Sequence, residues 1–218
     1  AALVIAGVGA IDDLRDVSAP AKVAGIVIAA SVLVISGISI LVFRVPFAGV
    51  FVLSTDWSYL LSVLWVVGMA NAINLIDGLD GLAGGIVAIA AATFFLYAHE
   101  LSGDGLLAAG NVGPLIAIVA LGACIGFLPH NFHPAKIFMG DAGALFIGIV
   151  MGVLTIRLDP NVKPQALSLV IPIALLAIPI LDTTVAVSSR LYRGISPFTG
   201  GRDHLSHRLM RIGMHRKY

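Results

Sequence analysis

Residues 58–98 read SYLLSVLWVVGMANAINLIDGLDGLAGGIVAIAAATFFLYA, in which two long apolar runs are separated by a short polar break. Each run is about 20 residues long, the length with which a helix crosses roughly 30 Å of hydrocarbon. The break at 77–81 holds two aspartates and two glycines, which suit a turn between helices. The pattern therefore predicts two membrane-spanning helices joined at one membrane face.

The composition of the whole chain agrees with a membrane environment. Hydrophobic residues make up 59% of the 218 residues, charged residues only 11%, and the mean hydropathy is +1.02. Such a chain has too little polar surface to cover a water-soluble domain. The net charge of +1 gives no basic attraction to nucleic acid. Cys124 is the single cysteine, so an intramolecular disulfide is excluded.

Similar apolar runs recur along the chain and predict an all-α, polytopic transmembrane helical bundle. We expect six complete spans and one partial span. The complete spans lie near 22–43, 58–76, 82–98, 112–129, 142–157 and 167–189, and a half-length run precedes them from Ala1 to Ile11.

Threading these spans places alternate loops on opposite sides of the membrane. One side receives residues 12–21, 77–81, 130–141 and 190–218. Ten of the 13 lysines and arginines fall on that side, and only Arg44, Arg157 and Lys163 fall on the other. The positive-inside rule predicts that the richer side is cytoplasmic in a multi-pass plasma-membrane protein.

Acidic and histidine side chains gather at the same predicted face, although the topology was drawn from apolar runs alone. Acids at a membrane edge are costly, so they indicate function. Several at one depth suggest a shared cation or phosphate. The members of this group are Asp12, Asp13, Asp77, Asp80, Asp141, His204 and His207.

Asp12 and Asp13 follow the first apolar run, at the end of a predicted helix. The negative end of the helix dipole opposes two acids there, so a compensating charge is expected. A solvated turn before Pro20 and a nearby divalent ion are both open as explanations.

The stretch 71–85 packs amides and acids into a glycine-rich break. Asn74, Asp77 and Asp80 are three residues apart and would project to one side. Helix capping explains one or two of them, but not all.

Asp141 precedes an apolar run and would serve as its N-cap if taken alone. With the other acids, Asp141 and Asp77 become candidate ligands of Mg²⁺, for which Mn²⁺ could substitute. Phe138 could be interfacial packing or a platform for a nucleobase.

His204 and His207 are three residues apart and would share a helix face. This spacing suits zinc as well as phosphate. Arg202 and Arg208 lie beside them and favour anion binding.

Two motifs carry a resemblance to a known family. They are NAINLIDGLDGLA at 71–83 and NFHPAKIFMGDAG at 131–143. With the acidic pair and the histidine stretch, in this order, they resemble the polyprenyl-phosphate N-acetylhexosamine-1-phosphate transferases. The resemblance covers nearly the whole chain and implies a single integral membrane transferase domain over residues 1–218, truncated at both ends.

The resemblance implies an Mg²⁺-dependent reaction at the cytoplasmic face of a bacterial membrane. A sugar 1-phosphate, here N-acetylglucosamine 1-phosphate, would pass from a UDP-sugar to undecaprenyl or decaprenyl phosphate, releasing UMP. The oligomeric state stays open, with a homodimer as one option. Catalytic roles are implied for Asp12, Asp13, Asp141, His204 and His207, and substrate binding for Asn74, Asp77, Asp80, Asn131, Phe138, Arg202 and Arg208.

Two positions depart from the family pattern. Ser206 stands where the family usually has a third histidine, and Ala144 stands where serine is common. These departures put the phosphate contacts in doubt but leave the metal site intact. The histidine stretch is closer to the N-acetylglucosamine branch than to the phospho-MurNAc-pentapeptide branch, which stays an alternative.

Two other classes of membrane protein would explain part of the pattern. A cation-coupled transporter would place its acids near the middle of the membrane, whereas here they lie at one edge. A prenyltransferase with paired aspartate motifs fits residues 77–80 in part but leaves the Gly-Asp and histidine motifs unexplained.

Overall fold

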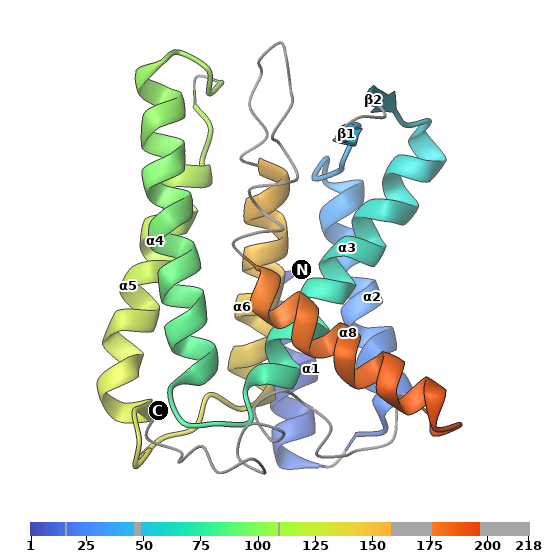
Figure 1. Ribbon diagram of the computed structural model, residues 1–218, viewed down its shortest axis with the longest axis vertical. Coiled ribbons are helices and arrows are strands. Elements are labelled where there is room, and N and C mark those ends of the chain that lie inside the picture. The colour runs from blue at the N-terminus through green and yellow to red at the C-terminus, as the bar shows by residue number, and fades with distance from the viewer. Residues whose placement is uncertain (16, 46–48, 109, 158–175, 197–218) are drawn as a thin grey trace.

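A computed structural model describes residues 1–15, 17–45, 49–108, 110–157 and 176–196. Within these ranges the chain forms seven helices and one antiparallel hairpin (Figure 1). The helices are α1 (Ala2–Leu14), α2 (Ala19–Ile35), α3 (Thr55–Ile76), α4 (Leu82–Gly103), α5 (Gly113–Asn131), α6 (Gly140–Arg157) and α8 (Ala177–Tyr192), and the hairpin consists of β1 (Val42–Val45) and β2 (Gly49–Val52).

Four helices, α3 to α6, are long and apolar enough to cross a membrane. Each contains an 18-residue window with a mean hydropathy of 1.5 or more. They coincide with the predicted spans near 58–76, 82–98, 112–129 and 142–157, so the prediction of an all-α, multi-pass membrane protein is confirmed.

The predicted span over 22–43 is wrong at its end. α2 stops at Ile35 after 17 residues, and residues 42–52 form the hairpin instead. Gly37 has a φ of 89°, in the left-handed region that glycine adopts at little cost, and its amide donates to the Val34 carbonyl. The β-branched residues beyond it favour strands, and they include Val42 and Val52, which pair across the hairpin.

The structure describes the whole of the first predicted apolar run but only part of the last predicted span. The half-length run at the N-terminus is helical but continues to Leu14, so Asp12 and Asp13 form its last turn. The last predicted span, 167–189, lies partly outside the described residues. Its second half belongs to α8, which crosses α3 obliquely (Figure 1).

The helices pack as two groups joined by α6. α4 and α5 lie side by side at one edge, while α1, α2 and α3 lie at the other, and α6 stands between them (Figure 1). One buried cluster centres on α3 and α4 and includes Phe94 and Leu154. A second cluster joins α1, α2, α3 and α6 around Ile5 and Leu145. α3 and α6 contribute to both clusters, so their contact holds the two groups together.

A close backbone approach defines the contact between α3 and α6. A Cβ atom at Gly148 of α6 would lie 2.7 Å from the Cα atom of Ala70 in α3. Seven residues further along α6, Thr155 accepts a hydrogen bond of 2.7 Å from the Trp65 indole. Small residues at helix crossings are typical of membrane proteins, where dispersion contacts and interhelical hydrogen bonds drive association.

We predict that Gly148→Ala destabilises the bundle by about 1–3 kcal/mol, because overpacking a close crossing forces the helices apart. The measurement is the apparent melting temperature of the detergent-solubilised protein. Gly122→Ala in α5 is the matched control, since nothing lies within 4 Å of its added Cβ atom. Equal melting temperatures for the two variants would contradict the close crossing.

Candidate active site

The ends of α1 and α3 and the start of α6 lie at the lower end of the bundle in Figure 1, and each carries polar residues. α1 ends there with Asp12 and Asp13, α3 ends there with Asn74 and Asp77, and α6 begins there with Asp141. Hydrogen bonds link Asp13 to the backbone of α6 and Asn74 to Asp141. The convergence predicted for Asp12, Asp13, Asp77 and Asp141 at one end of the bundle is therefore present.

Lys22 lies at the centre of this group. Its ammonium nitrogen is 2.5 Å from Asp12 Oδ2 and also donates to Asp141 Oδ2. Exposed fractions of 20%, 12% and 24% for Lys22, Asp12 and Asp141 show that water reaches this contact only in part. Sequence reasoning missed this role and counted Lys22 only as a cytoplasmic base. The available signal was a single lysine in the first turn of an apolar helix, shortly after an acidic pair.

Asp141 uses its two oxygens for two different helices. Oδ2 accepts from Lys22 of α2, and Oδ1 accepts a hydrogen bond of 2.7 Å from the Asn74 amide of α3. The sequence taken alone suggested that Asp141 caps its own helix, but in the structure its side chain bonds to α2 and α3 instead. It points across the bundle toward the other polar groups.

Asp13 caps α6 from another helix. Its Oδ1 and Oδ2 atoms accept hydrogen bonds from the backbone amides of Asp141 and Ala142, at 2.7 and 3.0 Å. Since a helix N-terminus carries unpaired amides and the positive end of the dipole, a carboxylate there is stabilised. The charge compensation expected for the acidic pair thus comes from Lys22 for Asp12 and from α6 for Asp13.

The pKa values of two of these acids move in opposite directions. The Asp141 carboxyl, as a hydrogen-bond partner, and then Lys22 and the Val17 amide lower the pKa of Asp12 to about 2. Burial, with the charges of Asp141 and Asp13, raises the pKa of Asp77 to about 7. Asp12 is therefore a very weak base at neutral pH, whereas a cation beside Asp77 would relieve its unfavourable charge.

The donor set fits Mg²⁺, which takes one or two carboxylates together with waters and phosphate oxygens. In the described part of the chain, no hydrogen bond holds the half-buried Asp77 carboxylate, so its oxygens are available to a cation. Asp141 belongs to the same polar group, and its charge contributes to the raised pKa of Asp77. Among the described residues, no three His, Cys, Asp or Glu side chains form a preformed metal cage.

A second polar cluster joins the α3–α4 and α5–α6 connections. Asp80 Oδ2 lies 2.8 Å from His133 Nδ1 and accepts a hydrogen bond of 3.1 Å from the Ala135 amide. Asn131 is 2% exposed and bonds to the Gly81 amide and the Ile137 carbonyl, both at 3.0 Å. In this structure Asp80 and Asn131 therefore fix the shape of two loops, and their predicted contacts with substrate stay predictions.

Phe138 lies in the α5–α6 connection, two residues before α6, and is 74% exposed. Its ring is available for stacking, as the sequence predicted, although no contact in the structure tests this. Four predicted site residues lie outside the described residues, namely Arg202, His204, His207 and Arg208.

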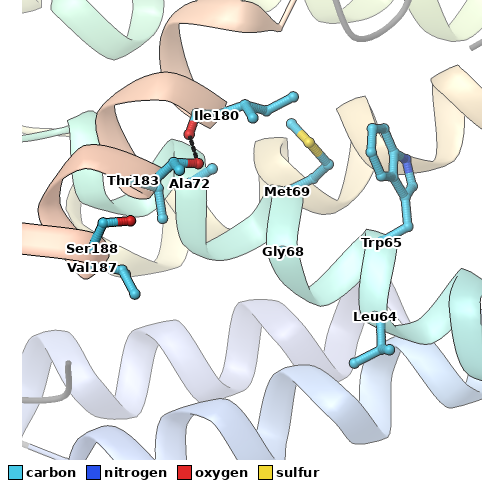
Figure 2. A pocket seen from close by; sticks show the side chains of 10 residues that line it. Leu64, Trp65, Gly68, Met69, Ala72, Ile180, Thr183, Val187 and Ser188 are labelled. Carbon is cyan, nitrogen blue, oxygen red and sulfur yellow. Dashed lines mark hydrogen bonds between the residues drawn. The ribbon is translucent and has the colours of Figure 1, made fainter. Parts of the chain in front are cut away.

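A largely apolar cavity of about 390 Å³ lies between α3 and α8 (Figure 2). α3 lines it from Leu64 to Ala72, and α8 lines it from Ile180 to Ser188. Ala72 is two residues before Asn74, so the cavity approaches the polar group along α3. Within the described part of the chain, the buried Thr183 hydroxyl has no hydrogen-bond partner.

Comparison with known proteins places these residues in a family context. The sequence model described as glycosyl transferase family 4 matches residues 1–159. The decaprenyl-phosphate N-acetylglucosaminephosphotransferase of Mycobacterium leprae is 38% identical over 229 residues, which cover 98% of this chain and 57% of that protein. The probable undecaprenyl-phosphate N-acetylglucosaminyl 1-phosphate transferase of Bacillus subtilis is 39% identical, with coverages of 98% and 57%.

A more partial match is the phospho-N-acetylmuramoyl-pentapeptide-transferase of Gemmatimonas aurantiaca. It is 44% identical over 115 residues, which cover 47% of this chain and 30% of that protein. The chain thus spans a little over half the length of the N-acetylglucosamine relatives and matches them almost from end to end.

We predict that Lys22→Met destabilises the protein by about 2 kcal/mol. This value lies between the cost of breaking a fully buried ion pair and that of breaking an exposed one, because the contact is partly shielded. The measurement is the shift in melting temperature at neutral pH.

A double variant provides the control for this prediction. Lys22→Met combined with Asp12→Asn removes one negative charge together with the positive one and should recover part of the loss. If the double variant is as unstable as the sum of the two single variants, Lys22 does not compensate Asp12.

Proposed function

The chain belongs to glycosyl transferase family 4, and from this membership we propose that it transfers N-acetylglucosamine 1-phosphate from UDP-N-acetylglucosamine to a polyprenyl phosphate and releases UMP. The names of the relatives from M. leprae and B. subtilis support this acceptor and this sugar. The observation that carries the proposal is Asp141, held by Lys22 and Asn74 at the end of an apolar bundle. A lipid phosphate and a soluble nucleotide can meet there.

The reaction exchanges one phosphoanhydride for another. An oxygen of the polyprenyl phosphate attacks the β-phosphorus of the UDP-sugar, and the bond from that phosphorus to the bridging oxygen breaks. UMP leaves with the electron pair of that bond. A phosphate monoester is largely a dianion at neutral pH, because its second pKa is near 6, so the acceptor needs little help from a base. Catalysis therefore rests on positioning and on charge neutralisation.

The polar residues at the ends of α1, α3 and α6, together with Lys22, have different roles in this positioning and neutralisation. Lys22 exchanges a carboxylate contact for a phosphate oxygen and so neutralises charge on the transferred group. Asn74 keeps the Asp141 side chain oriented by its hydrogen bond of 2.7 Å. Asp141 and Asp77 would hold Mg²⁺, which supplies further neutralisation of the phosphates when bound. Asp12 orients Lys22 rather than taking a proton.

The nucleotide side of the site rests on the sequence motifs. Phe138 offers an exposed ring that can stack on uracil. Two histidines and two arginines of the C-terminal stretch, whose basic character favours phosphate, would complete the diphosphate site. These four residues are His204, His207, Arg202 and Arg208.

The lipid would approach through the apolar cavity between α3 and α8. Its lining suits an isoprenoid chain (Figure 2). Because Ala72, at its edge, is two residues before Asn74, a lipid there could bring its phosphate toward the cluster. The excess of basic residues in the loops at this end favours the cytoplasmic face, where UDP-sugars are soluble.

UDP-MurNAc-pentapeptide, as an alternative sugar-phosphate donor, has weaker support. The relatives that bear this activity in their names match 47–55% of the chain, whereas the N-acetylglucosamine relatives match 97–98%. A cation-coupled transporter is disfavoured because the acids gather at one end of the helices.

We expect membranes that carry the full-length protein to catalyse the exchange of radiolabelled UMP into UDP-N-acetylglucosamine. The exchange should require both Mg²⁺ and polyprenyl phosphate, and Asp141→Asn should lower it about 100-fold or more, because the site loses a carboxylate ligand of the Mg²⁺ that neutralises the phosphates.

Asp56→Asn is the matched control, because Asp56 is exposed at the opposite end of α3 and should leave the rate unchanged. Folded protein that exchanges no UMP with any UDP-sugar would refute the transferase. Exchange with UDP-MurNAc-pentapeptide alone would reassign the sugar.

A further inference from the structure

Asp12 and Asp13 are adjacent in sequence but have different partners. Asp12 contacts the Lys22 side chain and the Val17 amide in the α1–α2 region. Within the described part of the chain, the Asp13 carboxylate accepts hydrogen bonds only from the backbone of α6, namely from the amides of Asp141 and Ala142. Asp12 therefore pairs with the ammonium group of Lys22, whereas Asp13 binds the N-terminus of α6.

The backbone at the start of α6 is shaped to receive the Asp13 carboxylate. Gly140 has a φ of 65°, which a residue with a side chain adopts only under strain. A Cβ atom at this position would lie 2.8 Å from Asp13 Oδ2. The turn thus leaves room for the carboxylate to reach both amides, with each oxygen accepting one hydrogen bond.

Gly9, one helical turn before Asp13, brings α1 against the same part of α6. A Cβ atom on Gly9 would lie 2.3 Å from the Cα atom of Ala142. Residues four apart lie on one face of a helix, so Gly9 and Asp13 form a continuous contact with the first turn of α6. Any change in this contact moves the backbone that carries Asp141.

We propose that Asp13 is a positioning residue, whose carboxylate holds the first turn of α6 so that the Asp141 side chain faces Lys22 and Asn74. The inference rests on the proposed function and adds a role that differs from metal binding and from proton transfer. Both oxygens of Asp13 already accept a hydrogen bond from the start of α6, so metal binding or proton transfer at either oxygen would compete with a bond that holds this turn.

Two substitutions at Asp13 separate these roles. Asparagine keeps an oxygen that accepts amide hydrogen bonds and ranks with aspartate as a helix cap, whereas alanine cannot cap. We expect Asp13→Asn to keep the UMP exchange rate within about 10-fold of the unmodified protein. Asp13→Ala should lose at least 100-fold and need at least 10-fold more Mg²⁺ for its half-maximal rate.

Binding of Mn²⁺, followed by electron paramagnetic resonance, provides a readout that does not depend on turnover. Positioning of Asp141 predicts weakened Mn²⁺ binding in Asp13→Ala and near-normal binding in Asp13→Asn. If both variants lose metal equally, Asp13 is itself a ligand. If both lose the exchange rate equally and keep the metal, Asp13 acts in the chemistry. Either result overturns the proposal.

Gly9→Ala tests the same contact without removing a carboxylate. Its added Cβ atom should push α6 away from α1 and raise the Mg²⁺ requirement, as in Asp13→Ala. Gly7→Ala on the same helix is the control, because nothing lies within 4 Å of its added Cβ atom. A normal Mg²⁺ requirement in Gly9→Ala would count against the proposal, and if this variant does not fold, the two Asp13 variants decide.

Absence of exchange in the unmodified protein would refute the proposed function, while the Mn²⁺ comparison would still test the role of Asp13.

Discussion

The contact of Lys22 with Asp12 and Asp141 is the interaction on which the polar end of the bundle depends. Carboxylates at the edge of an apolar bundle are unfavourable unless positive charge or donors face them. One ammonium faces two carboxylates here, and the amides of α6 face a third, that of Asp13. Among the described residues, no ion pair or hydrogen bond compensates the remaining acid, Asp77, and burial with the charges of Asp141 and Asp13 raises its pKa. A divalent cation would offset this excess of negative charge.

Helix packing makes this arrangement of charges possible. α6 is in close backbone contact with α1 at Gly9 and with α3 at Gly148, so three helices are held at fixed distances. Larger side chains at these crossings would separate Asp13 from the amides of α6. The small residues of the apolar segments thus set the geometry of the polar ones. This coupling explains how a polar site can be built at the end of helices whose sequence is dominated by lipid-compatible residues.

Much of the fold was predictable, because each apolar run is a local property of the chain. Four spans matched helices of the structure, and alternation of the loops correctly predicted that Asp12, Asp13 and Asp141 lie at one end. The error at residues 36–43 arose because hydropathy does not distinguish an apolar hairpin from the end of a helix. Gly37 marked that boundary, but a glycine within an apolar run is also common in membrane helices.

The sequence by itself determined the membrane class, the order of the spans and the family, since hydropathy, loop charge and the two motifs are encoded over short distances. Only the tertiary structure decided which acid meets which partner. Lys22 lies ten residues from Asp12 and far from Asp141 along the chain, and the cap that Asp13 provides joins the first helix to the sixth. Such pairings depend on how closely helices approach and on the direction of each side chain, and no local pattern encodes these quantities.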